Sequence, residues 1–368
     1  MPVPGLMIIL DGLQDTAYDM TDGKTPYDYG KRDNFREFET ASSTGLLLST
    51  PEGFEPDTQN CILYMLGVPA GEIPEGRSCI EALAQGIEVG YDDLIMRCNF
   101  VRVSDDGKLE IPCCAAPPEI AEALREEVSS LPGVSVYPVG SYKSLQLVRG
   151  KRSAIEGLVT SMPHQNQGEI FEDLLPRGNP FADGLADFSR RMLEKYRPYT
   201  VLNWAQSVER KLPAFAQLHS GMTGGIVSKT DCVVGVGLAM GMKAPAVPTA
   251  TGDTDTDIPA KLAATLELLR ENDFTMLHIG GTDEATHRQD PREKADFIAK
   301  LDRELLGPVM RGVKSGTRIM LTCDHEALCS TAGHTASPVR YWLWEKGKTL
   351  SGDMGISQGI KAVDILFK

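Results

Sequence analysis

The sequence predicts an α/β fold in which a mostly parallel sheet is flanked by helices. The main observation is a recurring pattern, in which a short apolar run ends one to four residues before an aspartate. Such runs are typical of parallel strands that are buried on both faces, and functional side chains of open α/β sheets gather where these strands end. The pattern occurs at residues 6–10 before Asp11, at 274–279 before Asp283 and at 317–322 before Asp324.

Helices are expected between these strands, which is the second observation behind the fold class. The clearest are residues 258–270 and 291–305, and the latter has a proline at its start and mixed charges along its length. Strands that alternate with helices favour a parallel sheet with helices on its faces. We therefore expect three carboxylates at one edge of this sheet.

The middle of the chain predicts a separate, inserted α+β domain. Turn-forming residues, a proline-rich stretch, one helical run and two short strands follow one another there. These features lie at residues 105–107, 112–118, 119–131, 134–139 and 145–148. A length of 368 residues also suggests about two domains. We expect a discontinuous core, residues 1–103 and 199–368, and a smaller lid domain, residues 104–198.

Composition limits the class of protein. No apolar run approaches the roughly 20 residues of a membrane span, so we expect a cytoplasmic protein without a membrane partner. A net charge of −14 argues against a nucleic-acid partner, because binding to phosphate backbones needs clustered Lys and Arg. The eight cysteines form no C-x-x-C pair and are expected to be reduced thiols. The oligomeric state is left open.

Two short stretches near the C-terminus predict a metal site. They combine three of the six histidines with two aspartates, at Asp283, His287, Asp324, His325 and His334. Imidazole and carboxylate ligands without thiolate suit Mn²⁺, Zn²⁺ or similar divalent ions, which hold and activate phosphate or water. The structural alternative is that these side chains are loop residues, turn formers or helix caps. The working hypothesis is a two-metal catalytic site, with Asp11 as a further carboxylate.

Thr58 is the candidate nucleophile, because phosphoryl transfer to the protein needs a hydroxyl that a metal can activate. It follows Pro56-Asp57 and precedes the apolar segment 61–66, which is expected to be a helix. The amides at the start of this helix could also receive a phosphate. The alternative is that Thr58 is an ordinary helix N-cap.

The chain resembles the archaeal-type cofactor-independent phosphoglycerate mutases of the alkaline phosphatase superfamily. The resemblance spans most of both core segments and is weak in the lid. It rests on Asp11-Gly12, Gly23-Lys24-Thr25-Pro26, Pro51-Glu52-Gly53, Leu66-Gly67, Gly76-Arg77, Glu81-Ala82, Arg97-Cys98-Asn99-Phe100, Gly252, Asp255-Thr256-Asp257, Asp283-Glu284-Ala285, His287, Asp324-His325 and Pro338-Val339.

The resemblance implies an alkaline-phosphatase-like fold with two divalent metal ions, Mn²⁺ or Zn²⁺. One ion falls to Asp11, Thr58, Asp324 and His325. The other falls to Asp283, His287 and His334. Family members generally have Gly-Ser-Asp where this chain has Asp57-Thr58-Gln59, so the nucleophile becomes a threonine. His278 is expected to be a hydrogen-bonded core or outer-sphere histidine rather than a ligand.

Substrate recognition departs from the family. The arginine-rich segment that family members carry after the Asn-Phe strand is replaced here by Pro112-Cys113-Cys114-Ala115-Ala116-Pro117. Because bidentate arginines supply both energy and orientation to bound anions, their loss leaves the substrate open. Arg77, Arg97 and Asn99 lie in matched motifs and are the expected substrate-binding residues.

The leading prediction is a metal-dependent phosphoglycerate mutase of glycolysis, which interconverts 3-phosphoglycerate and 2-phosphoglycerate through a phosphothreonine. The first alternative is a metal-dependent phosphatase or phosphotransferase acting on another small phosphorylated metabolite. The second alternative is a catalytically silent binding homologue. Intact metal ligands argue against the silent homologue, because several buried polar groups at strand ends are costly to keep without a use.

Overall fold

The computed structural model describes residues 3–368 and divides the chain into two compact units. Unit 1 contains the described residues up to Ile73 together with Leu212–Lys368, and unit 2 contains Pro74–Lys211. An inserted middle unit was expected, but its boundaries differ from 104 and 198. Strands β3 (Leu94–Val103) and β7 (Tyr199–Ser207) pair with each other in unit 2. The chain therefore enters unit 2 before β3 and leaves it after β7.

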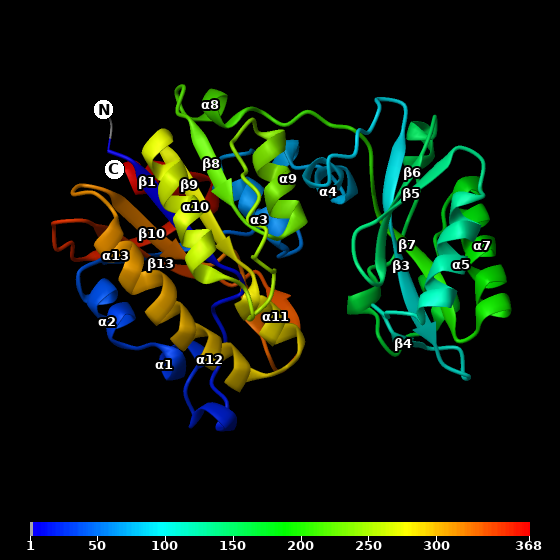
Figure 1. Ribbon diagram of the computed structural model, residues 1–368, viewed down its shortest axis with the longest axis horizontal. Coiled ribbons are helices and arrows are strands. Elements are labelled where there is room, and N and C mark those ends of the chain that lie inside the picture. Colours follow the sequence, from blue (N-terminus) through cyan, green and yellow to red (C-terminus); the bar gives the residue numbers. More distant parts are fainter. Residues whose placement is uncertain (1–2) are drawn as a thin grey trace. The chain divides into compact units, whose positions relative to one another are not determined.

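Unit 1 is built on a seven-stranded sheet, most of which is visible in Figure 1. Among the described strands, four of the six neighbouring pairs are parallel and the two pairs that include β13 are antiparallel. The predicted α/β class with a mostly parallel sheet is therefore confirmed. In spatial order the strands are β14 (Asp353–Gln358), β2 (Ser43–Leu48), β13 (Val339–Glu345), β10 (Arg318–Thr322), β1 (Gly5–Leu10), β9 (Phe274–Ile279) and β8 (Gly224–Val227).

The central strand β1 explains how the sheet presents its polar residues at one edge. Every residue of β1 is buried, because β10 and β9 flank it and helices cover both faces. In the parallel register, Ile9 lies opposite both Thr322 and His278. The three strands therefore end at nearly the same level, and the residues that follow them emerge together.

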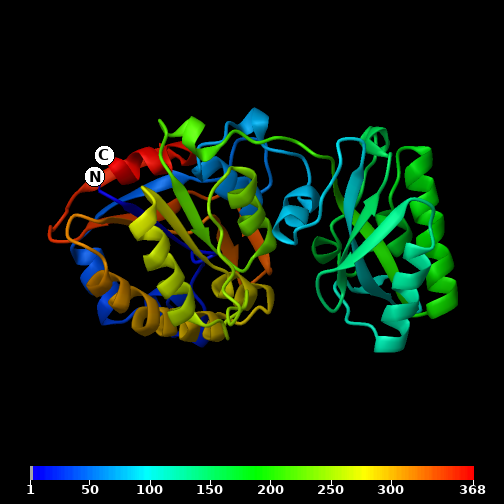
Figure 2. The same ribbon diagram turned by 45° about the horizontal axis from the view of Figure 1, so that its top comes forward.

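Helices cover both faces of the sheet in unit 1. Helix α10 (Ile258–Glu271) contacts β8 and β9, whereas the C-terminal helix α14 (Ala362–Phe367) contacts β1 and β10; Figure 2 shows them on opposite sides of the sheet. The remaining helices of unit 1 are α1 (Pro26–Gly30), α2 (Asp33–Thr40), α3 (Thr58–Met65), α8 (Phe215–Leu218), α9 (Asp231–Ala239), α11 (Gly281–His287), α12 (Pro291–Leu301) and α13 (Gly307–Gly312).

Local sequence determines where these helices begin. Helix α12 starts at Pro291 because the Asp290 side chain accepts hydrogen bonds from the N–H groups of Arg292 and Glu293. The expected helix 291–305 ends at Leu301 as an α-helix and continues as a π-helical segment, Asp302–Leu306. Short 3-10 segments lie at Asp19–Thr21, Ala70–Glu72, Arg152–Ile155, Pro163–Gln165 and Gly359–Lys361.

Unit 2 is an antiparallel α+β unit. Strand β3 pairs with β4, β6 and β7, and β5 pairs with β6. Its core is apolar and includes Phe100, Leu124 and Phe188. The other elements of unit 2 are β4 (Leu109–Ile111), β5 (Val134–Pro138), β6 (Lys143–Val148), α4 (Ser78–Ala84), α5 (Pro118–Ser129), α6 (Phe171–Leu174) and α7 (Pro180–Tyr196).

Within residues 3–368, every helix is too short or too polar to cross a lipid bilayer.

Candidate metal centre

Asp11 leaves the sheet at the end of β1. Its backbone N–H donates a hydrogen bond of 3.0 Å to the Ile279 carbonyl, so the pairing of this chain segment with β9 extends as far as Asp11. The chain then turns at Gly12, which has φ +60°, and the Gly12 N–H donates to Asp324 Oδ1 at 3.2 Å. A Cβ on Gly12 would lie 2.7 Å from the Ala327 Cβ. Glycine is therefore required by both the backbone angle and the available space.

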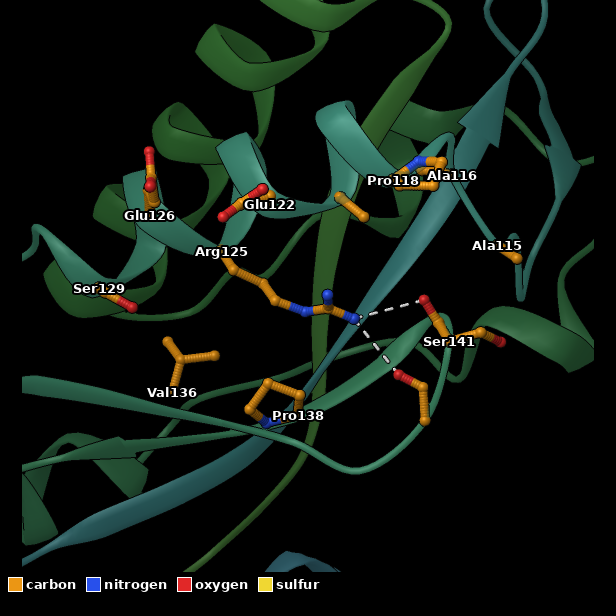
Figure 3. A pocket seen from close by; sticks show the side chains of 12 residues that line it. Ala115, Ala116, Pro118, Glu122, Arg125, Glu126, Ser129, Val136, Pro138 and Ser141 are labelled. Atoms are coloured by element: carbon orange, nitrogen blue, oxygen red, sulfur yellow. Dashed lines mark hydrogen bonds between the residues drawn. The ribbon is translucent and has the colours of Figure 1, made fainter.

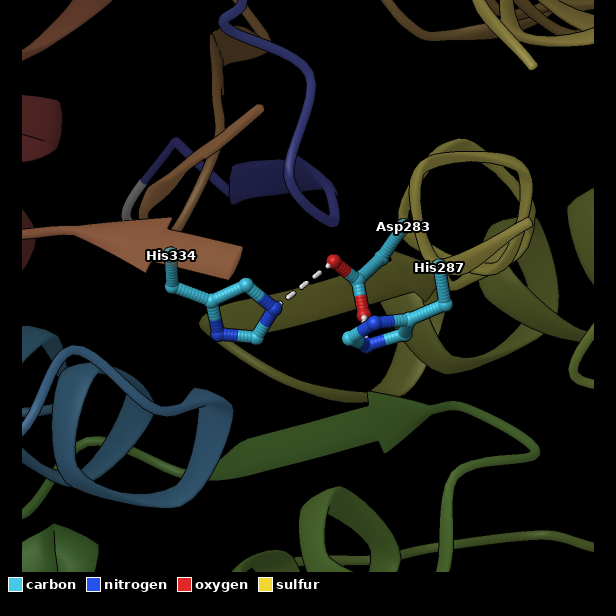
Figure 4. A group of neighbouring side chains, drawn as sticks. All are labelled: Asp283, His287 and His334. Atoms are coloured by element: carbon cyan, nitrogen blue, oxygen red, sulfur yellow. Dashed lines mark ion pairs between the residues drawn. The ribbon is translucent and has the colours of Figure 1, made fainter. Parts of the chain in front are cut away.

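Helix α11 supplies two predicted ligands from one face. Asp283 and His287 are four residues apart, which places them one helical turn from each other. Asp283 Oδ2 lies 3.1 Å from His287 Nε2, and Asp283 Oδ1 lies 3.1 Å from His334 Nε2. Figure 4 shows the Asp283 carboxylate between the two imidazole rings. The structure thus brings together all three residues that were expected to share one metal ion.

Asp324 and His325 follow β10 and lead into a short hairpin of β11 (Glu326–Leu328) and β12 (Gly333–Thr335). The hairpin returns His334 to the site, where its ring stacks on His325 with centroids 3.9 Å apart. His325 Nε2 lies 3.4 Å from both Asp11 Oδ1 and Asp324 Oδ2. The β11–β12 hairpin therefore explains how His325 and His334, two predicted ligands that are nine residues apart in the sequence, meet in space.

The side chains form three groups, in each of which the potential ligand atoms all lie within 4.8 Å of one another. Asp11 belongs to two of these groups and Asp283 to two, so the groups form one continuous cluster. The groups are Asp283 with His287 and His334, Asp11 with Asp283 and His325, and Asp11 with His278 and Asp324.

The cluster fits a divalent metal ion because many of its polar atoms lie 3.1–3.4 Å from one another without forming hydrogen bonds. In the part of the chain that the structure describes, seven buried oxygen and nitrogen atoms of the cluster make no hydrogen bond. Buried polar groups are nearly always hydrogen-bonded, and carboxylate with imidazole is a typical ligand set for divalent ions. The seven atoms are Asp11 Oδ1, His278 Nε2, Asp283 Oδ1, Asp324 Oδ2, His325 Nδ1, His325 Nε2 and His334 Nε2.

The protonation equilibria also indicate a site that needs positive charge. Burial raises the pKa of Asp11 well above its usual range, and repulsion from Asp324 and Asp283 raises it further. Burial would also raise the pKa of Asp283, but the contacts with the His287 and His334 rings outweigh burial and hold it well below its usual range. Burial lowers the pKa of His287, but Asp283 raises it to about 9. A cation bound here would replace these protons.

Thr58 is the first residue of α3, and Asp57 is the N-cap. The Asp57 side chain accepts a hydrogen bond from the Asn60 N–H at 2.8 Å, so the capping role considered for Thr58 belongs to its neighbour. His334 Nδ1 lies 3.0 Å from the Pro56 carbonyl. Pro56 is two residues before Thr58, so the segment that leads into Thr58 contacts a predicted metal ligand. The Thr58 hydroxyl is therefore not needed as the helix cap.

His278 belongs to the group with Asp11 and Asp324, although it was not expected to bind metal. It is fully buried on β9, with Nε2 at 3.2 Å from Asp11 Oδ2 and Nδ1 at 3.2 Å from Ser228 Oγ. Burial lowers its pKa to about 4, so the ring is neutral at neutral pH. The expected outer-sphere role of His278 stays a prediction, in which the ring would orient the Asp11 carboxylate. Its position one residue before the end of β9 is the sequence signal for this role.

The expected substrate residues lie in unit 2, where Arg77 and Arg97 meet at Glu81. Arg97 Nε donates to Glu81 Oε2 at 2.7 Å, and Arg97 Nη2 pairs with Glu81 Oε1. Arg77 Nε lies 3.2 Å from the same Oε1. The Arg97 guanidinium also lies over the Trp204 ring, 4.7 Å from its centroid. Sequence reasoning identified both arginines but missed Glu81, which was visible only as part of a matched motif.

Asn99 lies two residues after Arg97 on β3, so the two side chains share one face of the strand. Its Nδ2 contacts the Cys113 sulfur at 3.6 Å, whereas its Oδ1 is buried without a hydrogen bond. Cys113 belongs to the segment that replaces the family's arginines.

The continuation of this segment lines a separate groove of about 770 Å³ between α5 and β5. Figure 3 shows Arg125 crossing this groove, and its Nη2 donates to the Gly140 and Ser141 carbonyls. The guanidinium is therefore held by backbone oxygens. None of the three expected substrate residues lines this groove.

Comparison with known proteins places this cluster in a family. The model of the metalloenzyme superfamily matches residues 3–362. The chain is 30% identical to the 2,3-bisphosphoglycerate-independent phosphoglycerate mutase of Methanothrix thermoacetophila, over 93% of this chain and 91% of that protein. The chain belongs to the metalloenzyme superfamily and, within it, to this mutase family.

A second relative and two solved structures agree with this assignment of family and fold. The protein of the same name from Methanopyrus kandleri is 29% identical, over 92% of this chain and 87% of that protein. A solved structure from Pyrococcus horikoshii aligns with a TM-score of 0.75 at 22% identity, covering 100% of this chain and 97% of that one. The cofactor-independent phosphoglycerate mutase of Thermoplasma acidophilum aligns with a TM-score of 0.59 at 20% identity, covering 100% and 99%. These two structures show the shared fold.

Membership of the mutase family confirms the resemblance and the prediction of a metal-dependent phosphotransferase. Together with the three ligand groups, it supports the binding of divalent metal.

Proposed function

We propose that the protein interconverts 3-phosphoglycerate and 2-phosphoglycerate by phosphoryl transfer through Thr58. The observation that carries this proposal is the buried cluster of carboxylates and imidazoles at the strand ends of a member of the mutase family. A ligand set without thiolate suits phosphate chemistry on divalent ions.

The proposed ligands divide into two sets. Asp11, Thr58, Asp324 and His325 would hold one divalent ion, and Asp283, His287 and His334 would hold the other. Mn²⁺ and Zn²⁺ both suit these donors. When bound, such ions neutralise charge on the transferring phosphoryl group and lower the pKa of a coordinated hydroxyl.

In the proposed reaction, Thr58 Oγ1 attacks the phosphorus of the phosphomonoester in line with the departing oxygen. The Thr58 hydroxyl gives up its proton, the Oγ1–P bond forms, the ester O–P bond breaks, and the departing alkoxide takes up one proton, so that no net proton is gained or lost. The other hydroxyl of the released glycerate then attacks the phosphothreonine, which regenerates Thr58. The N-terminus of α3, which begins at Thr58, is suited to attract phosphoryl oxygens, because the helix dipole favours anions there.

Unit 2 is proposed to provide the lid and to bind the substrate carboxylate through Arg77, Arg97 and Asn99. Arg77 and Arg97 together carry one more positive charge than Glu81 neutralises, so the cluster retains attraction for an anion. The buried, unpaired Asn99 Oδ1 would accept a hydrogen bond from a substrate hydroxyl.

A phosphatase or phosphotransferase for another small phosphorylated metabolite is the second candidate. It is favoured by the segment Pro112-Cys113-Cys114-Ala115-Ala116-Pro117, which contains no cation, and by the engagement of both arginines with Glu81. If the substrate alcohol is held weakly, water attacks the phosphothreonine in its place and free phosphate is released.

Phosphorus NMR of the metal-loaded protein with 3-phosphoglycerate distinguishes these functions. Formation of 2-phosphoglycerate is the expected result, free phosphate alone would support the second candidate, and no turnover of any phosphomonoester would refute both. Thr58→Ala should abolish turnover, and Thr58→Ser should retain it. Thr25→Ala is the matched control, because Thr25 caps α1 through the Asp28 N–H. Full activity of Thr58→Ala would exclude Thr58 as the nucleophile.

A further inference from the structure

A fully buried ion pair lies beside the metal cluster in unit 1. Lys294 Nζ is 2.9 Å from Asp15 Oδ2, and neither side chain has any exposed surface. Charged side chains are almost never fully buried unless they are paired, and taking both charges out of water costs more than an apolar pair of similar volume. Stability alone is therefore a weak reason to keep this pair.

The pair also contacts backbone groups of the loop after β1 and of the β11–β12 hairpin. Lys294 Nζ also donates to the Ala327 carbonyl at 2.9 Å. Asp15 Oδ2 accepts from the Cys329 N–H at 3.3 Å, and Asp15 Oδ1 accepts from the Thr16 N–H at 2.7 Å. Asp15 and Lys294 thus connect the loop after β1 with the β11–β12 hairpin, and Lys294 connects these two segments with α12.

Tyr18 adds a second connection between the same loops. Its hydroxyl donates to Asp15 Oδ1 and accepts from the Ser330 N–H at 3.2 Å. Asp15 therefore has bonded partners on both of its oxygens, and the loop after β1 touches the hairpin at Cys329 and at Ser330.

Each of the three joined segments carries or adjoins proposed metal ligands. Asp15 is four residues after Asp11. Ala327 lies opposite His334 in the hairpin register. Lys294 is on α12, which contacts α11, the helix that carries Asp283 and His287. The ion pair is thus the point at which the loop, the hairpin and the helix pair are held together.

We propose that Asp15 and Lys294 are positioning residues that hold the three ligand-bearing segments at the spacing that metal binding requires. The inference rests on the metal centre of the proposed function. It extends that function by assigning to a buried ion pair, which touches no substrate or metal, control over metal affinity and ligand geometry. A pair that served stability alone could be exchanged for apolar residues without effect on the site.

The test compares stability with metal binding in the full-length protein. Lys294→Met leaves Asp15 unpaired, whereas the double change Asp15→Leu with Lys294→Met replaces the pair by apolar side chains. Co²⁺ is the probe, because its visible absorption spectrum reports ligand geometry, and its affinity is measured by competition with a chromogenic chelator. Melting temperature is measured on the same samples. Lys300→Met is the matched control, since Lys300 lies on the same helix and donates to the Thr254 and Thr256 carbonyls instead.

The double variant is expected to melt close to the wild-type temperature but to bind Co²⁺ at least about tenfold more weakly, with a changed spectrum. Wild-type affinity and spectrum in a stably folded double variant would overturn the proposal. Tyr18→Phe provides a milder test if the double variant does not fold, because Tyr18 is only half-buried. It should weaken Co²⁺ binding by about two- to threefold, and unchanged binding would count against the proposal.

The two hypotheses fail in different ways in these experiments. Absence of Co²⁺ binding by the wild-type protein would refute the metal centre and, with it, the positioning role. Wild-type binding without conversion of 3-phosphoglycerate would refute the mutase reaction and leave the positioning role intact. Wild-type binding that the apolar double variant fully retains would refute only the positioning role.

Discussion

Replacing Glu81 by Gln removes the one negative charge that two arginines share in unit 2. Glu81 is 1% exposed, and it pairs with Arg97 through both of its oxygens and with Arg77 through one. Burial alone would raise the pKa of Glu81, but the nearby Arg97 and Arg77 charges outweigh burial and lower it from 4.5 to about 2. Arg97 itself is 8% exposed, so the variant leaves its guanidinium buried without a counter-charge.

This pKa converts into a stability that depends on pH. A difference of about 2.5 pKa units, at roughly 1.4 kcal/mol per unit, corresponds to about 3 kcal/mol. Because the folded-state pKa is the lower one, this stability is fully present above about pH 4.5 and is lost as the pH falls towards 2. The difference between wild type and Glu81→Gln should therefore shrink from about 3 kcal/mol at pH 7 to about 1 kcal/mol at pH 3.

Hydrogen exchange of the β3 amides measures the difference in stability between wild type and Glu81→Gln for unit 2 alone. Strand β3 is suitable because it carries Arg97 and pairs with three other strands. Wild type and variant are compared at each pH, so intrinsic exchange rates cancel. Glu88→Gln is the matched control, since Glu88 is exposed in the same unit. A loss below about 1 kcal/mol at pH 7, or a loss that is equal at pH 7 and pH 3, would refute the charge argument.

Three further predictions concern the metal centre. Gly12→Ala should destabilise the protein by at least about 1 kcal/mol in urea denaturation, because a Cβ at φ +60° would meet the Ala327 Cβ. Metal affinity, measured by calorimetry, should rise with pH up to about 9, because binding has to displace the proton of His287. His278→Leu should weaken metal binding by about 10- to 100-fold, since Asp11 loses the imidazole beside it; unchanged affinity would exclude that role.

The sequence predicts that these side chains gather at one edge of the sheet because they occupy positions defined by local patterns. Asp11 and Asp324 follow apolar strands directly, and the spacing of Asp283 and His287 is one helical turn. The parallel register then brings the strand ends together. His334 is less directly predictable, since a hairpin has to return it to the site.

Features that depend on distant pairing are not visible in the sequence. The inserted unit begins at Pro74 rather than at residue 104 because β3 and β7 pair across about a hundred residues of chain. The Asp15–Lys294 pair joins residues 279 positions apart. Nothing in the local pattern distinguishes the buried Lys294 from Lys300, which is the other lysine of the same helix and is only half-buried.

The carboxylate cluster of unit 1 and the arginine cluster of unit 2 differ in how their charges are neutralised. This difference suggests separate roles for the two clusters in the proposed function. In unit 1, Asp11, Asp283 and Asp324 are buried close together, so a bound cation would stabilise this cluster. Substitution of a single member would leave its partners buried without compensation. In unit 2, Glu81 already neutralises most of Arg97, so an anion must compete with a carboxylate that is in place. The Arg77 side chain is 21% exposed against 9% for Arg97, so under the proposed function Arg77 is the more accessible of the two to a substrate anion. Under the proposed function, substitutions in unit 2 would therefore change substrate specificity and leave the metal centre of unit 1 intact.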